Sequence, residues 1–260
     1  MAPPALLELR NVTVMRGERV ALRNLSLTIG RGEHVCILGP NGCGKSTLIK
    51  TLTRECYPVH SEASSVAILG ERRWDVSELR KRLGIVSPDL LASCTGAATA
   101  REVVVSGFFS STRVFPHHRP RRDLYVRADA ALARVGISHL ADRPLSEMSS
   151  GEAKRTLVAR ALVHEPETLL FDEPGTALDI GVLAELKETM RQLARSGVGV
   201  LLVTHHVSEI IPEIDRVVLL REGALFADGP KAEVLTEQRL SALYGVPVKI
   251  VRHEGYLHVY

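Results

Sequence analysis

Apolar and polar positions mostly alternate along the first third of the chain. Residues 6–14 (LLELRNVTV) and 21–29 (ALRNLSLTI) have the period of a half-buried strand, with Gly17 in the connection between them. Residues 34–38 (HVCIL) form an unbroken apolar run, which indicates a strand buried on both faces. Another short strand is expected at 65–70 (SVAILG). This part of the chain therefore predicts a hairpin followed by further strands.

The pattern becomes helical in the middle of the chain and then returns to buried strands. Residues 90–147 are rich in Ala, Ser and Arg at helical spacing, and the basic run 116–122 (PHHRPRR) is expected to be a solvated surface loop. Strands are expected at 168–171, 199–204 and 216–221, with amphipathic helices between them. Because strands alternate with helices, the fold class is α/β with a mostly parallel sheet covered on both faces.

Composition excludes few classes of protein. The 260 residues are 45% apolar and 24% charged, and 33 basic minus 30 acidic residues give a net charge of +3, too small to argue for a nucleic-acid partner. The four cysteines have no zinc-like spacing and are expected to be reduced, mostly buried thiols. We expect neither a signal peptide nor a membrane span, because apolar stretches such as 197–203 are far shorter than about 20 residues.

The run GPNGCGKST at 39–47 matches G-x-x-x-x-G-K-[ST] between a predicted strand and a predicted helix. Its glycines allow backbone N–H groups to surround phosphate oxygens, and the helix that follows directs its positive end at the same anion. Lys45 is expected to reach the β- and γ-phosphates of ATP, Ser46 to bind Mg²⁺ and Thr47 to contact the α-phosphate. The predicted nucleotide contacts in this loop are Gly39, Pro40, Asn41, Gly42, Cys43, Gly44, Lys45, Ser46 and Thr47.

Two carboxylates follow the apolar strand expected at 168–171. Asp172 is placed to hold Mg²⁺ through water, and Glu173 to polarise the attacking water as general base, at the strand end where α/β folds bind ligands. The next strand ends in VTHH, where His205 is either a structural histidine or a contact of the γ-phosphate and the attacking water. Glu173, His205 and Lys45 are the predicted catalytic residues.

The stretch MSSGEAKRTLVARAL at 148–162 resembles the signature motif of ABC ATPases, usually Leu-Ser-Gly-Gly-Gln followed by an arginine-rich helix. Ser149 and Gly151 keep the pattern, whereas Met148, Ser150 and Glu152 depart from it. The resemblance implies that Ser149 and Gly151 contact ATP held by a second subunit, so that hydrolysis requires a homodimer.

The resemblance extends over the whole chain. TALD at 176–179 resembles the D-loop, which implies that Asp179 lies at the subunit interface, and the tail 227–251 resembles those of siderophore and cobalamin importer ATPases. A likeness to molybdenum-type ATPases is the alternative. The implied fold is one ABC ATPase domain over 1–260: a P-loop NTPase (RecA-like) core with an antiparallel β-subdomain at 1–85 and 160–230, an α-helical signature subdomain at 86–159 and an extension at 231–260.

Two positions depart from the family. Arg16 occupies the place where an aromatic residue usually stacks on adenine; we expect its guanidinium to cover the base, the alternative being a solvent-facing hairpin arginine. In GIVSPDLL (84–91), Pro88 occupies the place of a glutamine that reaches Mg²⁺. Asp89 is the preferred substitute ligand and Ser87 the second; equally, neither reaches the metal and the segment serves only docking.

The resemblance implies the ATP-hydrolysing subunit of an ABC transporter. It dimerises head-to-tail around two ATP and drives a separate transmembrane permease, importing a metal chelate or an oxyanion, at the cytoplasmic face of the membrane. The alternative is a soluble ABC ATPase that acts on nucleic acid or ribosomes. A single cassette, with about 100 residues and no sustained heptads between phosphate loop and signature, favours the transporter and no direct nucleic-acid contact.

Overall fold

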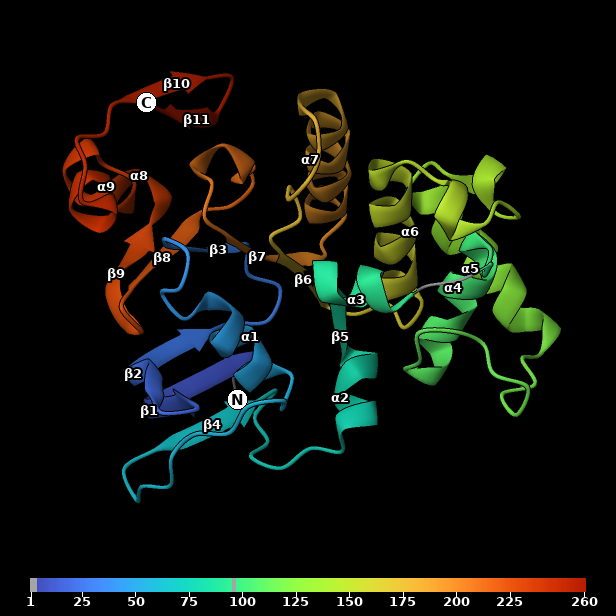
Figure 1. The fold of residues 1–260 in the computed structure, drawn as a ribbon, viewed down its shortest axis with the longest axis horizontal. Coiled ribbons are helices and arrows are strands. Elements are labelled where there is room, and N and C mark those ends of the chain that lie inside the picture. The colour runs from blue at the N-terminus through green and yellow to red at the C-terminus, as the bar shows by residue number, and fades with distance from the viewer. Residues whose placement is uncertain (1–3, 95–96) are drawn as a thin grey trace. The chain divides into compact units, whose positions relative to one another are not determined.

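The structure, a computed structural model, describes residues 4–94 and 97–260. These residues form two compact units. The first unit comprises the described residues up to Val76 together with Gly199–Tyr260, and the second comprises Ser77–Val198. Figure 1 labels the helices and strands of both.

The boundaries of these units differ from those of the predicted subdomains. The helical signature subdomain was expected at 86–159, whereas the second unit extends to Val198 and includes the strand that carries Asp172. The division into core, β-subdomain, helical subdomain and extension stays a prediction.

A three-stranded antiparallel sheet begins the first unit, in the order β2-β1-β4. Leu7 is paired with Ile29 on one side and with Ile68 on the other, and all three side chains are at most 1% exposed. The alternation of apolar side chains thus becomes one buried face of this sheet. The strands are β1 (Leu7–Arg16), β2 (Arg19–Ile29) and β4 (Ser65–Ile68).

Four further strands of the first unit lie in the order β7-β3-β8-β9. β3 pairs in parallel with β7 and β8, and β9 runs antiparallel to β8. Every residue of β3 is buried, as expected for an unbroken apolar run. Leu38 at the end of β3 is opposite Thr204 at the end of β7, so the segments that follow these strands leave the sheet at one edge. The strands are β3 (Val35–Leu38), β7 (Gly199–Thr204), β8 (Arg216–Arg221) and β9 (Ala224–Pro230).

Short helices and a hairpin complete the first unit. The hairpin closes with backbone hydrogen bonds in both directions between Lys249 and Tyr260, and Ile250 is paired with Val259. The elements are α1 (Lys45–Leu52), η4 (Val207–Glu209), α8 (Lys231–Val234), α9 (Glu237–Tyr244), β10 (Ile250–His253) and β11 (Tyr256–Val259).

The second unit combines a parallel strand pair with helices (Figure 1). Gly84 on β5 is opposite Leu169 on β6, and a Cβ at Gly84 would lie 2.2 Å from the Leu169 side chain. That Cβ would also lie 3.0 Å from the Ala161 carbonyl oxygen, so a larger residue fits only if these neighbours shift. The elements are α2 (Val76–Arg82, which begins at the junction of the units), β5 (Leu83–Val86), α3 (Pro88–Ser93), α4 (Ala100–Ser106), η1 (Gly107–Phe109), α5 (Arg122–Arg134), η2 (Ser138–Leu140), η3 (Leu145–Glu147), α6 (Ser150–Leu162), β6 (Thr168–Asp172) and α7 (Ile180–Arg195).

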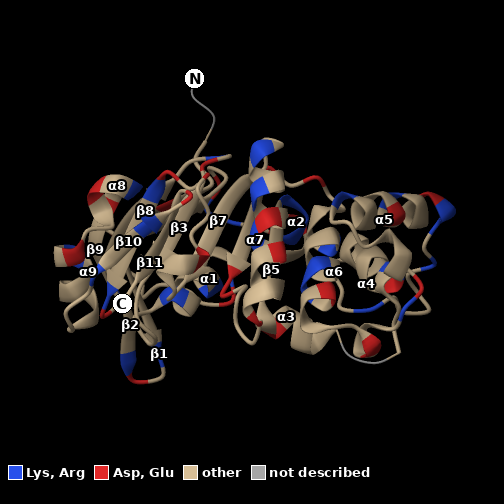
Figure 2. Cartoon of the chain, turned by 90° about the horizontal axis from the view of Figure 1, so that it is seen from above, with Lys and Arg blue, Asp and Glu red and all other residues tan. Residues whose placement is uncertain are grey.

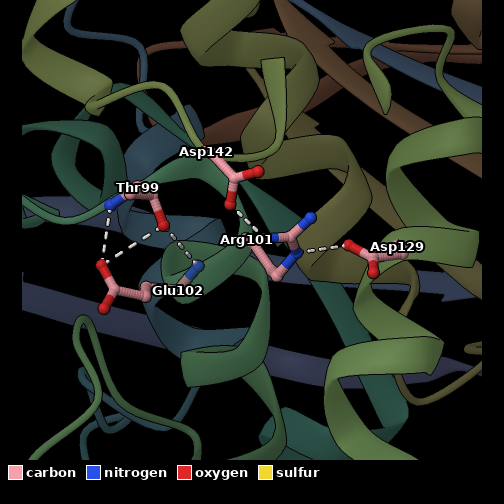
Figure 3. A network of polar contacts seen from close by, with 5 residues as sticks. All are labelled: Thr99, Arg101, Glu102, Asp129 and Asp142. Carbon is pink, nitrogen blue, oxygen red and sulfur yellow. Dashed lines mark hydrogen bonds and ion pairs between the residues drawn. The ribbon is translucent and has the colours of Figure 1, made fainter. Parts of the chain in front are cut away.

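A polar network fixes the start of α4 (Figure 3). The Thr99 hydroxyl accepts a hydrogen bond from the Glu102 N–H at 3.3 Å, while the Glu102 carboxylate accepts one from the Thr99 N–H at 2.9 Å. This capping box satisfies two N–H groups at the helix start. Arg101 pairs with Asp129 on α5 and with Asp142, and the hydrogen bond to Asp129 is the main reason why the pKa of Arg101 is raised.

The long helix α7 has one apolar and one charged side. Leu186, Met190 and Leu193 are buried, at the spacing of one helical face. On the other side, Glu188 forms ion pairs with Arg191 at 3.5 Å and with Arg195 at 3.9 Å. Figure 2 shows basic positions towards one end of this helix and acidic positions next to them. Such exposed pairs contribute little stability each, so the apolar face holds α7 in place.

The strands predicted at 6–14, 21–29, 34–38, 168–171 and 216–221 are confirmed as β1, β2, β3, β6 and β8. Those predicted at 65–70 and 199–204 are confirmed as β4 and β7. The described part of 90–147 is largely helical, as expected.

The basic run 116–122 precedes and enters α5, and most of it is a loop, as predicted. Although its composition is polar and basic, the loop makes specific packing contacts. His118 stacks on Phe109 with ring centroids 4.3 Å apart, and its Nδ1 accepts a hydrogen bond from the Phe115 N–H at 3.1 Å. Aromatic side chains before the run therefore anchor it.

Helices α6 and α7 approach closely at Gly151. A Cβ there would lie 2.2 Å from Cγ1 of Val182, a distance that real side chains do not adopt. Because valine is stiff about χ1 in a helix, this methyl cannot easily turn away. The space that a side chain at 151 would need is thus filled by α7.

We expect Gly151→Ala to destabilise the chain by about 1 to 3 kcal/mol, because the added methyl overpacks the α6–α7 contact. Urea unfolding of the purified variant measures the loss. The double variant Gly151→Ala with Val182→Ala should regain most of the stability.

Gly181→Ala is the matched control for that substitution. Its Cβ would meet only Asp179 Oδ1, at an ordinary 3.4 Å, and alanine favours a helix by about 1 kcal/mol over glycine. Gly181→Ala should therefore be at least as stable as the parent. Equal stability of Gly151→Ala and the parent would contradict the packing argument.

Candidate functional site

The phosphate-loop sequence connects β3 to α1 in the first unit. Gly42 and Gly44 have φ values of 78° and 107°, in the left-handed region that favours glycine. A Cβ at Gly44 would lie 2.5 Å from the Ala21 carbonyl oxygen, and one at Gly39 would lie 2.4 Å from that of Leu220. Two different strands therefore press against the loop, and only glycine fits at both positions.

Lys45 is buried within this loop, with 4% of its surface exposed. Its Nζ donates hydrogen bonds to the carbonyl oxygens of Gly39 at 2.8 Å and Pro40 at 3.1 Å. A buried ammonium needs such partners, because desolvating an unpaired charge costs several kcal/mol. The positive charge is thus held against the loop at the start of α1, whose N-terminus carries further partial positive charge.

The other side chains of the loop divide by exposure. Asn41 and Ser46 are exposed, whereas Thr47 and Cys43 are buried. The Cys43 thiol is packed against Gly39, so it fills space inside the loop. Pro40 contributes its carbonyl to Lys45.

His205 follows β7 and is half-buried, with its ring centroid 3.9 Å from that of His206. The turn around it is held by buried polar contacts. The Thr204 hydroxyl donates to Glu209 at 2.7 Å and accepts from the His206 N–H at 3.0 Å. Because Leu38 and Thr204 are opposite residues, His205 and the phosphate loop begin side by side at one sheet edge.

Asp172 and Glu173 lie at the end of β6 in the second unit, and both are half-buried. Glu173 has φ 44°, a left-handed conformation that costs a non-glycine residue about 1 to 3 kcal/mol. The turn that follows is tied to α6, because buried Lys154 donates to the carbonyl oxygens of Pro174 at 2.6 Å and Thr176 at 2.5 Å. Analysis of the sequence did not identify Lys154.

Ser149 is the N-cap of α6. Its hydroxyl accepts from the Glu152 N–H at 3.3 Å, and the Glu152 carboxylate accepts from the Ser149 N–H at 2.8 Å. This hydrogen bond from the Ser149 N–H is the main cause of the lowered pKa of Glu152, with Arg143 and Arg155 adding to it. Glu152, which departs from the family glutamine, therefore completes a capping box that either residue type can form. Gly151 is buried under Val182.

Asp179 caps the next helix. Its Oδ1 accepts a hydrogen bond from the Val182 N–H at 2.9 Å at the start of α7. Ile180 beside it is 89% exposed, a high value for a large apolar side chain. The structure describes one chain, so the expected subunit contact of Asp179 stays a prediction.

The segment 84–91 differs from a plain loop. β5 runs to Val86, the Ser87 hydroxyl accepts from the Leu90 N–H at 3.2 Å, and Pro88 begins α3. Ser87 thus has a capping role, while Asp89 lies exposed in the first turn of α3. Ser-Pro before a helix is a recognisable start signal, which the expectation of a metal-binding loop overlooked.

Arg16 ends β1 and is exposed at the tip of the hairpin. Its Nη1 approaches Cys56 Sγ at 3.5 Å. Arg19 is the paired residue across the hairpin. The contact with Cys56 gives Arg16 a partner that the sequence did not predict.

The predicted site residues lie in both units. The phosphate loop, Arg16 and His205 belong to the first unit, whereas Asp89, Ser149, Asp172, Glu173 and Asp179 belong to the second. Among the described residues there is no cluster of three or more His, Cys, Asp or Glu side chains suited to a metal, and no helix there is long and apolar enough to span a membrane.

Comparison with known proteins gives the family. Residues 22–176 match the ABC transporter family. The uncharacterized ABC transporter ATP-binding protein YlmA of Bacillus subtilis (strain 168) is 32% identical over 251 residues, 95% of this chain and 93% of that protein. The hemin import ATP-binding protein HmuV of Bordetella avium (strain 197N) is 35% identical over 257 residues, 95% of each chain.

A solved structure agrees with this assignment. The dimeric structure of MJ0796, a bacterial ABC transporter cassette, superposes with a TM-score of 0.70 at 26% identity, covering 86% of this chain and 98% of that one. The predicted family and the predicted P-loop NTPase α/β fold are confirmed. The chain belongs to the ABC transporter family, as an ATP-binding subunit that hydrolyses ATP in service of transport.

Proposed function

We propose that this subunit drives the import of a metal chelate through a separate permease, working as a homodimer around two ATP. The single observation that carries the ATPase part is the buried Lys45 ammonium, hydrogen-bonded inside a loop that only glycines can form. The import direction and the cargo class are supported by the similarity to HmuV, which is named for hemin import. A subunit of this kind lies on the cytoplasmic face of the membrane, bound to its permease.

The cofactor is Mg²⁺ together with ATP. Ser46 offers an exposed hydroxyl at the start of α1 and Asp172 a half-buried carboxylate, and hard oxygen donors of this kind suit Mg²⁺. The ion supplies charge neutralisation for the phosphates when bound. Ser46 and Asp172 would hold it, and Glu173 would take a proton from the attacking water.

The remaining residues act around the nucleotide. In this proposal His205 contacts the γ-phosphate, and Ser149 with Gly151 presents the start of α6 to the ATP bound by the partner subunit. Asp179 and the exposed Ile180 contribute to the dimer interface. The alternative is a soluble ABC ATPase acting on nucleic acid or ribosomes. Binding to nucleic acid favours a strongly basic protein, and the net charge of this chain is only +3.

Co-purification from membranes tests the transport proposal. The tagged chain should be recovered with a stoichiometric membrane protein. Recovery of RNA or DNA that salt releases, with no membrane protein, would overturn the proposal in favour of the soluble ATPase.

Glu173→Gln should lower ATP turnover at least about 100-fold, because it removes the proposed general base while keeping the size of the side chain. ATP binding should be retained, and ATP should increase the fraction of dimer measured by light scattering. Glu165→Gln, at an exposed position beyond α6, is the control and should leave turnover unchanged. Full turnover by Glu173→Gln would remove Glu173 from the mechanism.

Asp89→Ala should lower turnover about ten-fold and raise the Mg²⁺ concentration needed for half-maximal rate, because we propose that its carboxylate reaches the metal. The dissociation constant of ATP should stay the same. Ser87→Ala is the comparison: it removes the α3 cap and costs about 1 kcal/mol of stability without changing the Mg²⁺ dependence. An unchanged rate for Asp89→Ala in the isolated dimer would show that the segment serves only docking.

Arg16→Ala should weaken ATP binding about three- to ten-fold, because we propose that the guanidinium stacks on adenine. Arg19→Ala, the exposed partner across the hairpin, is a matched control that removes the same charge and should bind ATP normally. Isothermal titration of the two variants with ATP gives both constants. Equal affinities of the variants would instead make Arg16 a solvent-facing hairpin residue.

A further inference from the structure

We propose that Tyr244, in the C-terminal segment, is a positioning residue for His205. This inference rests on the proposed function, because it requires His205 to act on the nucleotide. It goes beyond that function, since it makes the C-terminal segment part of the ATPase site.

The contact itself is a single hydrogen bond. Tyr244 is the last residue of α9, and its hydroxyl donates to the backbone carbonyl oxygen of His205 at 3.1 Å. Gly245 follows with φ 73° and ends the helix, so the ring leaves α9 at a defined place. The two residues are 39 positions apart in sequence, yet both belong to the first unit.

Tyr244 also lines two cavities. One, of about 320 Å³, is lined by phosphate-loop residues 40–43 together with 221–222 and 242–245. The other, of about 630 Å³, is lined by 205–208 with 246–248 and 258–260. Tyr244 lines both cavities, so this one residue borders the cavity beside the phosphate loop as well as the cavity beside the turn that carries His205.

The state of the hydroxyl favours donation. Burial raises the pKa of Tyr244 to about 12, with Cys36 and Cys43 adding to the effect. The group is therefore protonated throughout the physiological pH range, and its hydrogen bond to a neutral carbonyl does not titrate there. This contact acts as a constant restraint.

The restraint acts on the peptide group that follows His205. The carbonyl oxygen of this group accepts the hydrogen bond from Tyr244, and its N–H, which belongs to His206, donates to the Thr204 hydroxyl at 3.0 Å. Thr204 lies in the turn itself and also donates to Glu209, whereas Tyr244 holds the same peptide group from α9. The Tyr244 hydroxyl therefore helps to fix the backbone from which the imidazole of the proposed γ-phosphate contact extends.

The helix that presents Tyr244 is itself anchored. Arg221 Nη1 donates to the Ala242 carbonyl at 3.1 Å, and the Ser241 hydroxyl accepts from the Val248 N–H at 2.9 Å. Glu237 at the start of α9 accepts from the Ile250 N–H at 3.0 Å, which joins the helix to the C-terminal hairpin. A residue held this firmly transmits its position to the group it contacts.

The test is Tyr244→Phe in the full-length protein with saturating Mg·ATP. This change keeps the aromatic ring and removes only the hydroxyl. We expect kcat to fall about three- to ten-fold, because a His205 that is held less firmly stabilises the transition state less well, with KM for ATP within about two-fold. Tyr125→Phe, on α5 in the second unit, is the matched control and should keep the parent kcat.

A second measurement, by NMR spectroscopy, reports on the His205 side chain itself. In protein labelled with ¹⁵N-histidine, the imidazole signals of His205 are identified by their loss in His205→Ala. They should shift in Tyr244→Phe and stay in place in Tyr125→Phe.

The outcomes separate the two proposals. If His205→Ala keeps parent turnover, the proposed role of His205 fails and this inference with it. If His205→Ala is impaired but Tyr244→Phe keeps the parent kcat and the parent imidazole signals, only the positioning role is overturned. Parallel losses of kcat, ATP affinity and melting temperature in Tyr244→Phe would also overturn it, because they indicate general packing.

Discussion

The close approach of backbone to backbone around the phosphate loop is the constraint on which the rest of the site depends. A side chain at Gly44 would need the space that the Ala21 carbonyl on β2 occupies. A side chain at Gly39 would need the space of the Leu220 carbonyl on β8. The loop is thus formed by β2 and β8 as much as by its own sequence. Since β3 supplies the edge from which it starts, sheet order and loop shape are parts of one arrangement.

Each unit contains one buried lysine held by backbone carbonyls. Lys45 binds those of Gly39 and Pro40 in the first unit, and Lys154 binds those of Pro174 and Thr176 in the second. A buried ammonium is costly unless its partners are in place, so each lysine penalises conformations in which its loop opens. Lys45 orders the phosphate loop, and Lys154 orders the turn that follows Glu173.

The sequence predicted the fold well where the local pattern and the tertiary structure agree. Apolar runs became the buried strands β3 and β7, because a strand covered on both faces carries apolar side chains at nearly every position, and the polar Thr204 at the end of β7 is hydrogen-bonded. The place of Lys45 and Ser46 at the start of α1 was equally predictable, because a contiguous motif between a strand and a helix puts them there. The segment at 84–91 was harder, because the same Ser-Pro-Asp serves as a helix start and as an approximate match to a metal-binding loop.

By itself the sequence determined the family, the α/β class, the phosphate loop and the order of the motifs, since each is written in residues close together along the chain. Only the tertiary structure decided which residues support them: Tyr244 on His205, Val182 over Gly151, Lys154 on the turn after Glu173 and Cys56 beside Arg16. These contacts join residues between 20 and 40 positions apart, and none has a local signature. Their physical reason is packing, because a side chain acquires such a partner only when folding brings two distant segments within hydrogen-bond or van der Waals distance.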